Sequence, residues 1–297
     1  MYFDIRTDLA CEMYEKSEAE KWGAEWHDEE HEGVKITRLR IRNEEAERAY
    51  QKPCGEYVTL DCGKLHLLSP SAYRVTRSLL VRELRRMVSH VTSKRIDGSF
   101  CVLIVGLGNA SLTADAIGPA TVKRLTATRH LKTHDQGLFR SLECSALCAL
   151  APGVIGQTGI ETQEIIKGVV RLVQPDLLIA VDALAARSCA RLSCTVQLSD
   201  CGISPGSGVG NHRAELSSKT LGTPVIALGV PTVVNSSTLV LDALQTAGIE
   251  QIDRRLQAVL DNGTGFFVTP KDSDVITQTF AALLADAIGG VFAPQVP

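Results

Sequence analysis

Apolar runs of strand length alternate with stretches of helical character over the last two thirds of the chain. The runs are CVLIVGL, LLIAVDA and PVIALGV, at residues 101–107, 177–183 and 224–230. Helical stretches are expected near residues 116–127, 161–173 and 236–260, and again from Thr269 to Ile288. This alternation predicts an α/β fold whose central, mostly parallel or mixed sheet is flanked by helices.

The chain before residue 100 has a different pattern. Residues 33–41 and 56–62 alternate like half-buried strands, which predicts a small N-terminal antiparallel appendage, and a helix is expected over 71–90. The first fifty residues are charged, with acidic and histidine side chains crowded at 25–32, and we predict a surface arm or linker there. Residues 194–198, CTVQL, form a further strand candidate, expected to be antiparallel at an edge.

Composition narrows the classes of function. A hydrophobic share of 44% with 22% charged residues is typical of a globular protein, and no apolar run of bilayer length is apparent, so we expect no membrane contact. The first residues lack the pattern of a secretory signal, so we expect a cytoplasmic protein. A net charge of -3 predicts no direct binding of nucleic acid. The nine cysteines include no Cys-x-x-Cys pair and are expected to be reduced thiols.

An aspartate is associated with each of the first two apolar runs. Asp115 comes after the first run and the glycines Gly106 and Gly108, and Asp182 comes directly after LLIAV in the second run. Both are therefore expected just past the carboxyl end of a strand. Open α/β sheets bind their ligands there. Two carboxylates held together can share a proton and activate water, as in an acid protease. Taken singly, each acid is explained equally well by a structural role. Asp115 could cap a helix, and Asp182 could accept hydrogen bonds from backbone amides.

Other motifs are weaker. Gly106 and Gly108 follow a strand, but the third glycine and the acid of a dinucleotide site are missing. The loop PGSGVGN at residues 205–211 lacks the Lys-Ser/Thr pair of a P-loop. His27 and His31 imitate a zinc motif, but the stretch has Asp28 at its second position and no apolar face.

Several blocks of sequence together resemble the germination proteases of spore-forming bacteria, over nearly the whole chain. The blocks are RTDLACE (6–12), VGLGN (105–109), TADAIGP (113–119), TRH (128–130), PGVIGQTGIET (152–162), DALAARS (182–188), GISPGSGVGN (202–211) and GVPTVV (229–234). The resemblance implies an endopeptidase that degrades small acid-soluble spore proteins during germination. It also implies a homotetramer located in the cytoplasm of the forespore and in the spore core.

The same resemblance implies roles for particular residues. Asp115 and Asp182 match the two aspartates held to be catalytic in the family. Members are made as zymogens that remove a short N-terminal segment after an acid followed by an aliphatic residue and alanine. This implies a cut between Asp8 and Leu9. We therefore expect a pro-segment at 1–8, an N-terminal arm and small β/helix appendage at 9–99, and a catalytic core with a C-terminal helix at 100–297.

Residues that support the reaction are less well defined by sequence. Candidates that could stabilise a developing oxyanion are Ser188, Thr158 and the backbone amides of the loop from Gly106 through Gly108 to Asn109. No metal or other cofactor is expected in this mechanism. The same blocks also resemble hydrogenase maturation endopeptidases, whose acids hold a metal. In that alternative Asp115 and Asp182 would be ligands, with His212 as a third; without a metal, His212 is a candidate supporting residue of the catalytic site.

Overall fold

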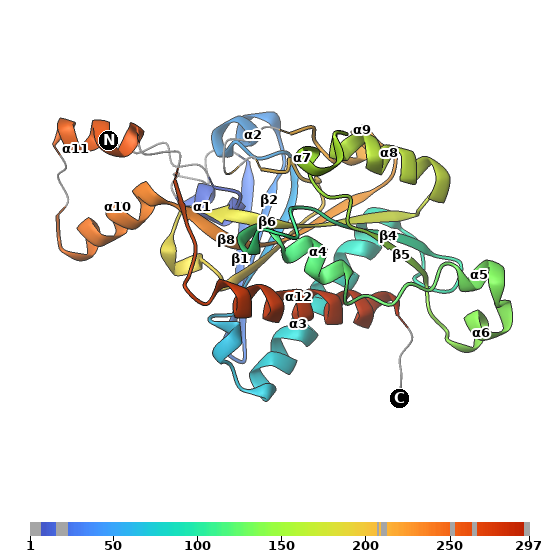
Figure 1. Ribbon diagram of the computed structural model, residues 1–297. Helices are drawn as coiled ribbons and strands as arrows, with labels where there is room; N and C mark the ends of the chain where they lie inside the picture. The colour runs from blue at the N-terminus through green and yellow to red at the C-terminus, as the bar shows by residue number, and fades with distance from the viewer. Residues whose placement is uncertain are drawn as a thin grey trace.

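The computed structural model describes residues 7–15, 23–206, 208, 213–249, 253–262 and 266–293. One nine-stranded sheet crosses the molecule in the order β1-β2-β3-β7-β8-β6-β4-β5, with β9 beside β8 (Figure 1). The strands are β1 (Ala24–His31), β2 (Val34–Ile41), β3 (Gly55–Asp61), β4 (Cys101–Gly106), β5 (Ala146–Leu150), β6 (Leu177–Ala186), β7 (Thr195–Ser199), β8 (Val225–Asn235) and β9 (Phe267–Val268). The α-helices are α1 (Ala10–Glu15), α2 (Glu44–Tyr50), α3 (Pro70–Thr92), α4 (Ile117–Val122), α5 (Leu131–His134), α6 (Gln136–Ser141), α7 (Ile155–Thr158), α8 (Thr162–Val173), α9 (Ser218–Leu221), α10 (Ser236–Thr246), α11 (Arg254–Asn262) and α12 (Ser273–Phe292).

The sheet is mixed, which confirms the predicted fold class. Strands β5, β4, β6 and β8 are parallel, whereas β7 runs antiparallel to both β8 and β3. The antiparallel strands β1, β2 and β3 continue the same sheet through the pairing of β3 with β7. The prediction that CTVQL lies at an edge was therefore wrong. All five residues of β7 are buried because the strand lies inside the sheet.

Strand β1 replaces the surface arm predicted for residues 25–32. It pairs with β2 along its whole length, from Ala24 opposite Ile41 to His31 opposite Val34. Edge strands commonly carry charged side chains, which prevent pairing with another molecule. Because β1 is such a strand, its sequence lacks the apolar alternation by which a strand is predicted. The structure thus corrects this prediction.

Helices cover both faces of the sheet. Helices α3, α4 and α12 lie on one face and α8 on the other, while α10 and α11 extend from one end (Figure 1). The largest core, between the sheet and the first helix layer, includes Leu84, Ile104, Ile179, Phe280 and Leu284. The stretch expected to be helical over 236–260 is divided into α10 and α11, and Gly248 follows α10 in the left-handed region at φ +74°.

Helix α12 corrects the expectation that no segment could span a bilayer. Its 20 residues are long and apolar enough to do so, and its best 18-residue window has a mean hydropathy of 1.6. In the fold, 61% of that window is buried. The helix packs against α3 and α4 within the largest core, which accounts for its apolar composition.

Candidate active site

Asp182 lies within strand β6 rather than past its end, which corrects the sequence-based placement. The parallel partner β4 ends at Gly106, opposite Val181, so Asp182 is the first residue of β6 beyond that pairing. On its other side β6 continues along β8, and Asp182 is opposite Gly229. The carboxyl group is buried, with the residue 5% exposed, and its Oδ1 accepts a hydrogen bond from the Ala183 N–H at 3.0 Å.

Asp115 reaches the same region from the loop between β4 and α4. It ends the short 3-10 helix Thr113–Asp115, and its Oδ2 accepts a hydrogen bond from the Asn109 N–H at 2.7 Å. Gly108 allows this close approach: its φ is +107°, and a Cβ there would lie 2.1 Å from the Asp115 carbonyl oxygen. The carboxyl does not cap α4, because the N-cap is Ala116 and it makes no side-chain cap bond.

The two carboxyl groups influence each other. Burial raises the pKa of Asp182 well above its usual range, and the charges of Asp115 and Asp8 raise it further. Burial also raises the pKa of Asp115, against the opposing effects of the Asn109 N–H and the Arg213 charge. Arg213 likewise lowers the pKa of Asp182. Both carboxyl groups therefore hold their protons to a higher pH than an ordinary aspartate does, Asp182 more strongly.

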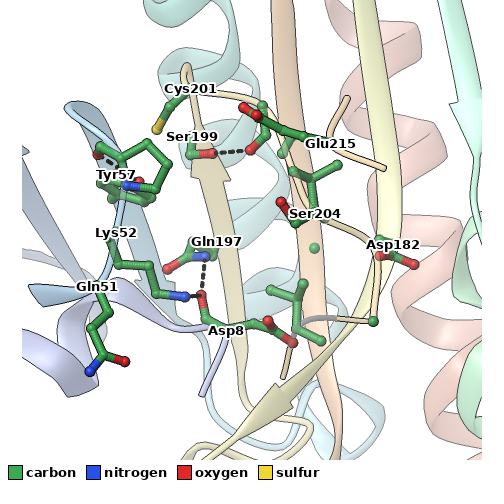
Figure 2. Close-up of a pocket in the computed structure, with 17 residues that line it drawn as sticks. Asp8, Gln51, Lys52, Tyr57, Asp182, Gln197, Ser199, Cys201, Ser204 and Glu215 are labelled. Atoms are coloured by element: carbon green, nitrogen blue, oxygen red, sulfur yellow. Dashed lines mark hydrogen bonds between the residues drawn. The ribbon is translucent and has the colours of Figure 1, made fainter. Parts of the chain in front are cut away.

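Two adjoining cavities meet at Asp182 and Asp8. The larger, of about 480 Å³, is also lined by Asp115 and Arg213. The smaller, of about 170 Å³, is lined on its other side by Lys52 and Gln197 (Figure 2). Asp8 therefore lies between a group of carboxyls and a group of hydrogen-bond donors.

The N-terminal segment is docked against the end of β6. The Asp8 N–H donates to the Ala185 carbonyl at 2.9 Å, and the Ala185 N–H donates to Asp8 Oδ2 at 2.8 Å. Leu9 is fully buried in an apolar cluster with Leu184 and Val234. Gly208 closes over the Asp8 carboxylate, since a Cβ there would lie 2.3 Å from Oδ2. Asp8, whose carbonyl forms the bond to Leu9, is thus held in the wall of the cavity that Asp115 and Asp182 also line.

Glu12 anchors this segment and explains where Ser188 lies. The buried Glu12 carboxylate accepts hydrogen bonds from the N–H groups of Arg187 at 2.8 Å and Ser188 at 3.0 Å, and from the Thr7 hydroxyl. The Ser188 hydroxyl accepts from the Ala190 N–H at 3.2 Å. The structure therefore places Ser188 at the anchor of the segment, apart from Asp115 and Asp182.

The other predicted supporting residues mainly shape the loop around Asp115. A Cβ on Gly106 would lie 2.3 Å from the Gly118 carbonyl oxygen, so Gly106 lets α4 pack closely on β4. The Asn109 side chain accepts from Gln157 Nε2 at 3.0 Å. Thr158 is exposed, and its hydroxyl bonds to backbone carbonyls of its own turn. His212 lies outside the described residues.

No group of three or more His, Cys, Asp or Glu side chains arranged to hold a metal occurs within the described ranges. The set proposed for a metal, Asp115 and Asp182 with His212, has its third member outside those ranges. All nine cysteines are described, and all are free thiols.

Sequence reasoning missed three residues of the site: Lys52, Gln197 and Arg213. Lys52 Nζ donates to the carbonyl oxygens of Thr7 and Asp8, at 2.9 and 3.1 Å. Gln197 Nε2 donates to the Asp8 carbonyl at 3.1 Å. A glutamine within the buried strand CTVQL was the one available signal, since buried amides need partners.

The mixed sheet and the cavity lined by two aspartates define an α/β protein with a candidate hydrolase site, and comparison with known proteins gives its class, a protease. A sequence model described as germination protease matches residues 4–258. The chain belongs to the germination protease family.

Curated relatives extend over almost the same length. The germination protease of Clostridium acetobutylicum is 38% identical over 98% of this chain and 96% of its own. That of Caldanaerobacter subterraneus is 40% identical over 98% and 94%. That of Priestia megaterium is 42% identical over 82% and 66%.

Among solved structures, one match is the [NiFe] hydrogenase maturation protease HycI of Thermococcus kodakarensis. It covers 65% of this chain and 97% of HycI, with 16% identity and a TM-score of 0.30. A likeness this weak supports no argument about the site.

Proposed function

We propose that this protease degrades small acid-soluble spore proteins during germination, inside the spore, through the carboxyl pair Asp115 and Asp182. The observation that carries the proposal is that Asp8, whose carbonyl belongs to the bond before Leu9, lines the same cavity as Asp115 and Asp182. Membership of the germination protease family supports the substrate class.

In the proposed mechanism the two carboxyls divide the work of acid and base. The ionised carboxylate takes a proton from water as the water oxygen attacks the scissile carbonyl carbon. The protonated partner donates its proton to the leaving nitrogen as the C–N bond breaks. The raised pKa of Asp182 supports this division because Asp182 holds its proton to a higher pH than an ordinary aspartate does.

We further propose that the chain is a zymogen that cuts itself between Asp8 and Leu9. Asp8 lines both cavities, where a protein substrate would have to bind, so this residue blocks the site until the segment is removed. We also propose that the enzyme acts as a homotetramer, which the mass of the purified protein in solution would test.

The experiment follows the full chain and its Asp115→Asn and Asp182→Asn variants. N-terminal sequencing detects the new end at Leu9, and electrophoresis detects cleavage of an added small acid-soluble spore protein. We expect each variant to lose at least about 10²-fold in rate, the scale of general acid-base catalysis. Asp272→Asn, at an exposed cap that makes no side-chain cap bond, is the matched control.

Each reaction is repeated after exhaustive chelation. Full activity of the parent in chelator supports the carboxyl pair. Loss of activity that one added metal restores would instead make Asp115 and Asp182 ligands. A folded parent that cuts neither itself nor the spore protein would overturn the proposal.

A further inference from the structure

The carbonyl oxygen of Asp8 is held by two side chains from distant parts of the chain. Lys52 Nζ and Gln197 Nε2 each donate to it at 3.1 Å. Figure 2 shows both side chains reaching Asp8 from one side of the cavity, while Asp182 comes from a different strand on the other side. This oxygen belongs to the bond that precedes Leu9.

Gln197 fixes the chain on both sides of that bond. Its Nε2 donates to the carbonyl of Asp8, and its Oε1 accepts from the Ala10 N–H at 2.8 Å. The glutamine is 8% exposed and sits in β7, between β3 and β8, so its backbone is held by neighbours on both sides. A rigid strand is a suitable support for a group that must meet a reacting atom.

Lys52 supplies a second N–H donor at the same oxygen. Burial lowers the pKa of its ammonium, and the nearby Asp8 and Glu12 carboxylates oppose that effect only in part. The ammonium also bonds to the Thr7 carbonyl at 2.9 Å. Two donors from different elements thus converge on one carbonyl of the segment.

We propose that Lys52 and Gln197 form the oxyanion site for cleavage of the Asp8–Leu9 bond, an inference that rests on the proposed function. When water attacks the carbonyl carbon, the C=O π electrons move to oxygen, and the two donors stabilise the resulting negative charge. Collapse of the intermediate restores the C=O bond and breaks the C–N bond. The leaving nitrogen receives its proton from the aspartate pair. A protein substrate that replaces the segment presents its carbonyl to the same donors.

The contrasting interpretation is that these side chains only tether the segment. The two roles differ in what they change. A tether changes whether the segment stays docked, whereas an oxyanion site changes how fast the docked bond is cut. The rate of self-cleavage and the docking of the segment must therefore be measured on the same full-length protein.

The test compares Lys52→Met and Gln197→Glu with the parent. Gln197→Glu keeps an acceptor for the Ala10 N–H but removes the donor to the Asp8 carbonyl. The first-order appearance of the Leu9 terminus gives the rate, and hydrogen exchange at the Ala10 amide reports docking. We expect the rate of Lys52→Met to fall by about 10² to 10³-fold with the Ala10 amide still protected. Lys52→Arg should recover part of the rate, and the exposed Lys64→Met serves as the control.

Three results would overturn the proposal. The first is self-cleavage of the Lys52→Met variant at the parental rate. The second is a rate that falls only in proportion to the loss of protection at Ala10, which would mean that Lys52 merely tethers the segment. In both cases a parent that is active and Asp182→Asn that is inactive would leave the proposed function intact. A parent that produces no Leu9 terminus and cuts no spore protein would end both proposals.

Discussion

At the scale of single residues, the candidate site contains a buried carboxyl group that destabilises the fold. Asp182 is 5% exposed, and burial followed by the charges of Asp115 and Asp8 raises its pKa. Above the ordinary pKa of an aspartate, the folded state therefore binds more protons here than the unfolded state. The sign follows directly: this group lowers the stability of the fold as pH rises.

Asp182→Asn should therefore be more stable than the parent at neutral pH, and the difference should shrink as pH falls toward the ordinary pKa of aspartate. Each unit by which the pKa is raised corresponds to about 1.4 kcal/mol. Thermal unfolding of both proteins from pH 4 to pH 8 measures this. An equal or lower Tm for the variant at pH 7 would contradict the expected burial penalty.

At the scale of elements, a charged network fastens helix α3 to the N-terminal strands. The Glu83 side chain is 1% exposed and accepts from Arg38 Nη2 at 2.7 Å, Arg82 Nε at 3.0 Å and Arg86 Nε at 3.1 Å. Arg38 belongs to β2, and Arg86 also pairs with Glu56 in β3 at 2.9 Å. The network compensates a buried carboxylate at the junction of helix and sheet.

Glu83→Gln should lower the free energy of unfolding at pH 7 by about 2 kcal/mol, less than for a fully buried pair because the arginines are partly solvated. Burial raises the pKa of Glu83, but Arg38 and Arg86 outweigh it and the net pKa is lowered. The carboxylate's contribution is therefore present above the unfolded pKa and is lost as pH falls through the folded pKa. Urea unfolding at pH 7 and pH 3 tests this, with the exposed Glu30→Gln as control. A loss that is as large at pH 3 would contradict it.

The elements also show what the sequence can and cannot predict. Strands β4, β6 and β8 were predicted because they are buried on both faces and read as continuous apolar runs. Edge strand β1 was missed because most of its side chains are acidic or histidine, and β5 was missed because its sequence, ALCAL, contains no β-branched or aromatic residue. The position of Asp182 inside β6 depends on where the shorter partner β4 stops, and local sequence does not contain that information.

At the scale of the whole molecule, the site brings together residues that are far apart in the sequence. Asp8 contacts Ala185 and Gln197, which are 177 and 189 residues away. Asp115 and Asp182 could be proposed from sequence blocks, but Lys52 and Gln197 could not, because only the folded sheet brings β7 to the N-terminal segment. Contacts between residues so far apart leave no periodic pattern in the sequence, so they cannot be predicted from it.

Removing residues 1–8 should leave the fold intact and the site open. Leu9 is fully buried, and α1 is anchored by Glu12, so the chain that follows the cut retains its own contacts. A protein that begins at Leu9 is expected to cut an added spore protein without a lag, whereas the full chain shows a lag that matches its processing. Circular dichroism establishes folding. A folded but inert truncated protein would show that inhibition resides elsewhere.

The Thr7 hydroxyl gives the proposed cut a chemical consequence of its own. It accepts from the Leu9 N–H at 3.1 Å and donates to the Glu12 carboxylate, so it bridges the two. Cleavage after Asp8 removes this bridge and creates an ammonium group on Leu9, close to a buried anion that has just lost a partner. The new chain end would then add a positive charge near the Glu12 side chain, which the Arg187 and Ser188 N–H groups and the Arg191 guanidinium continue to hold.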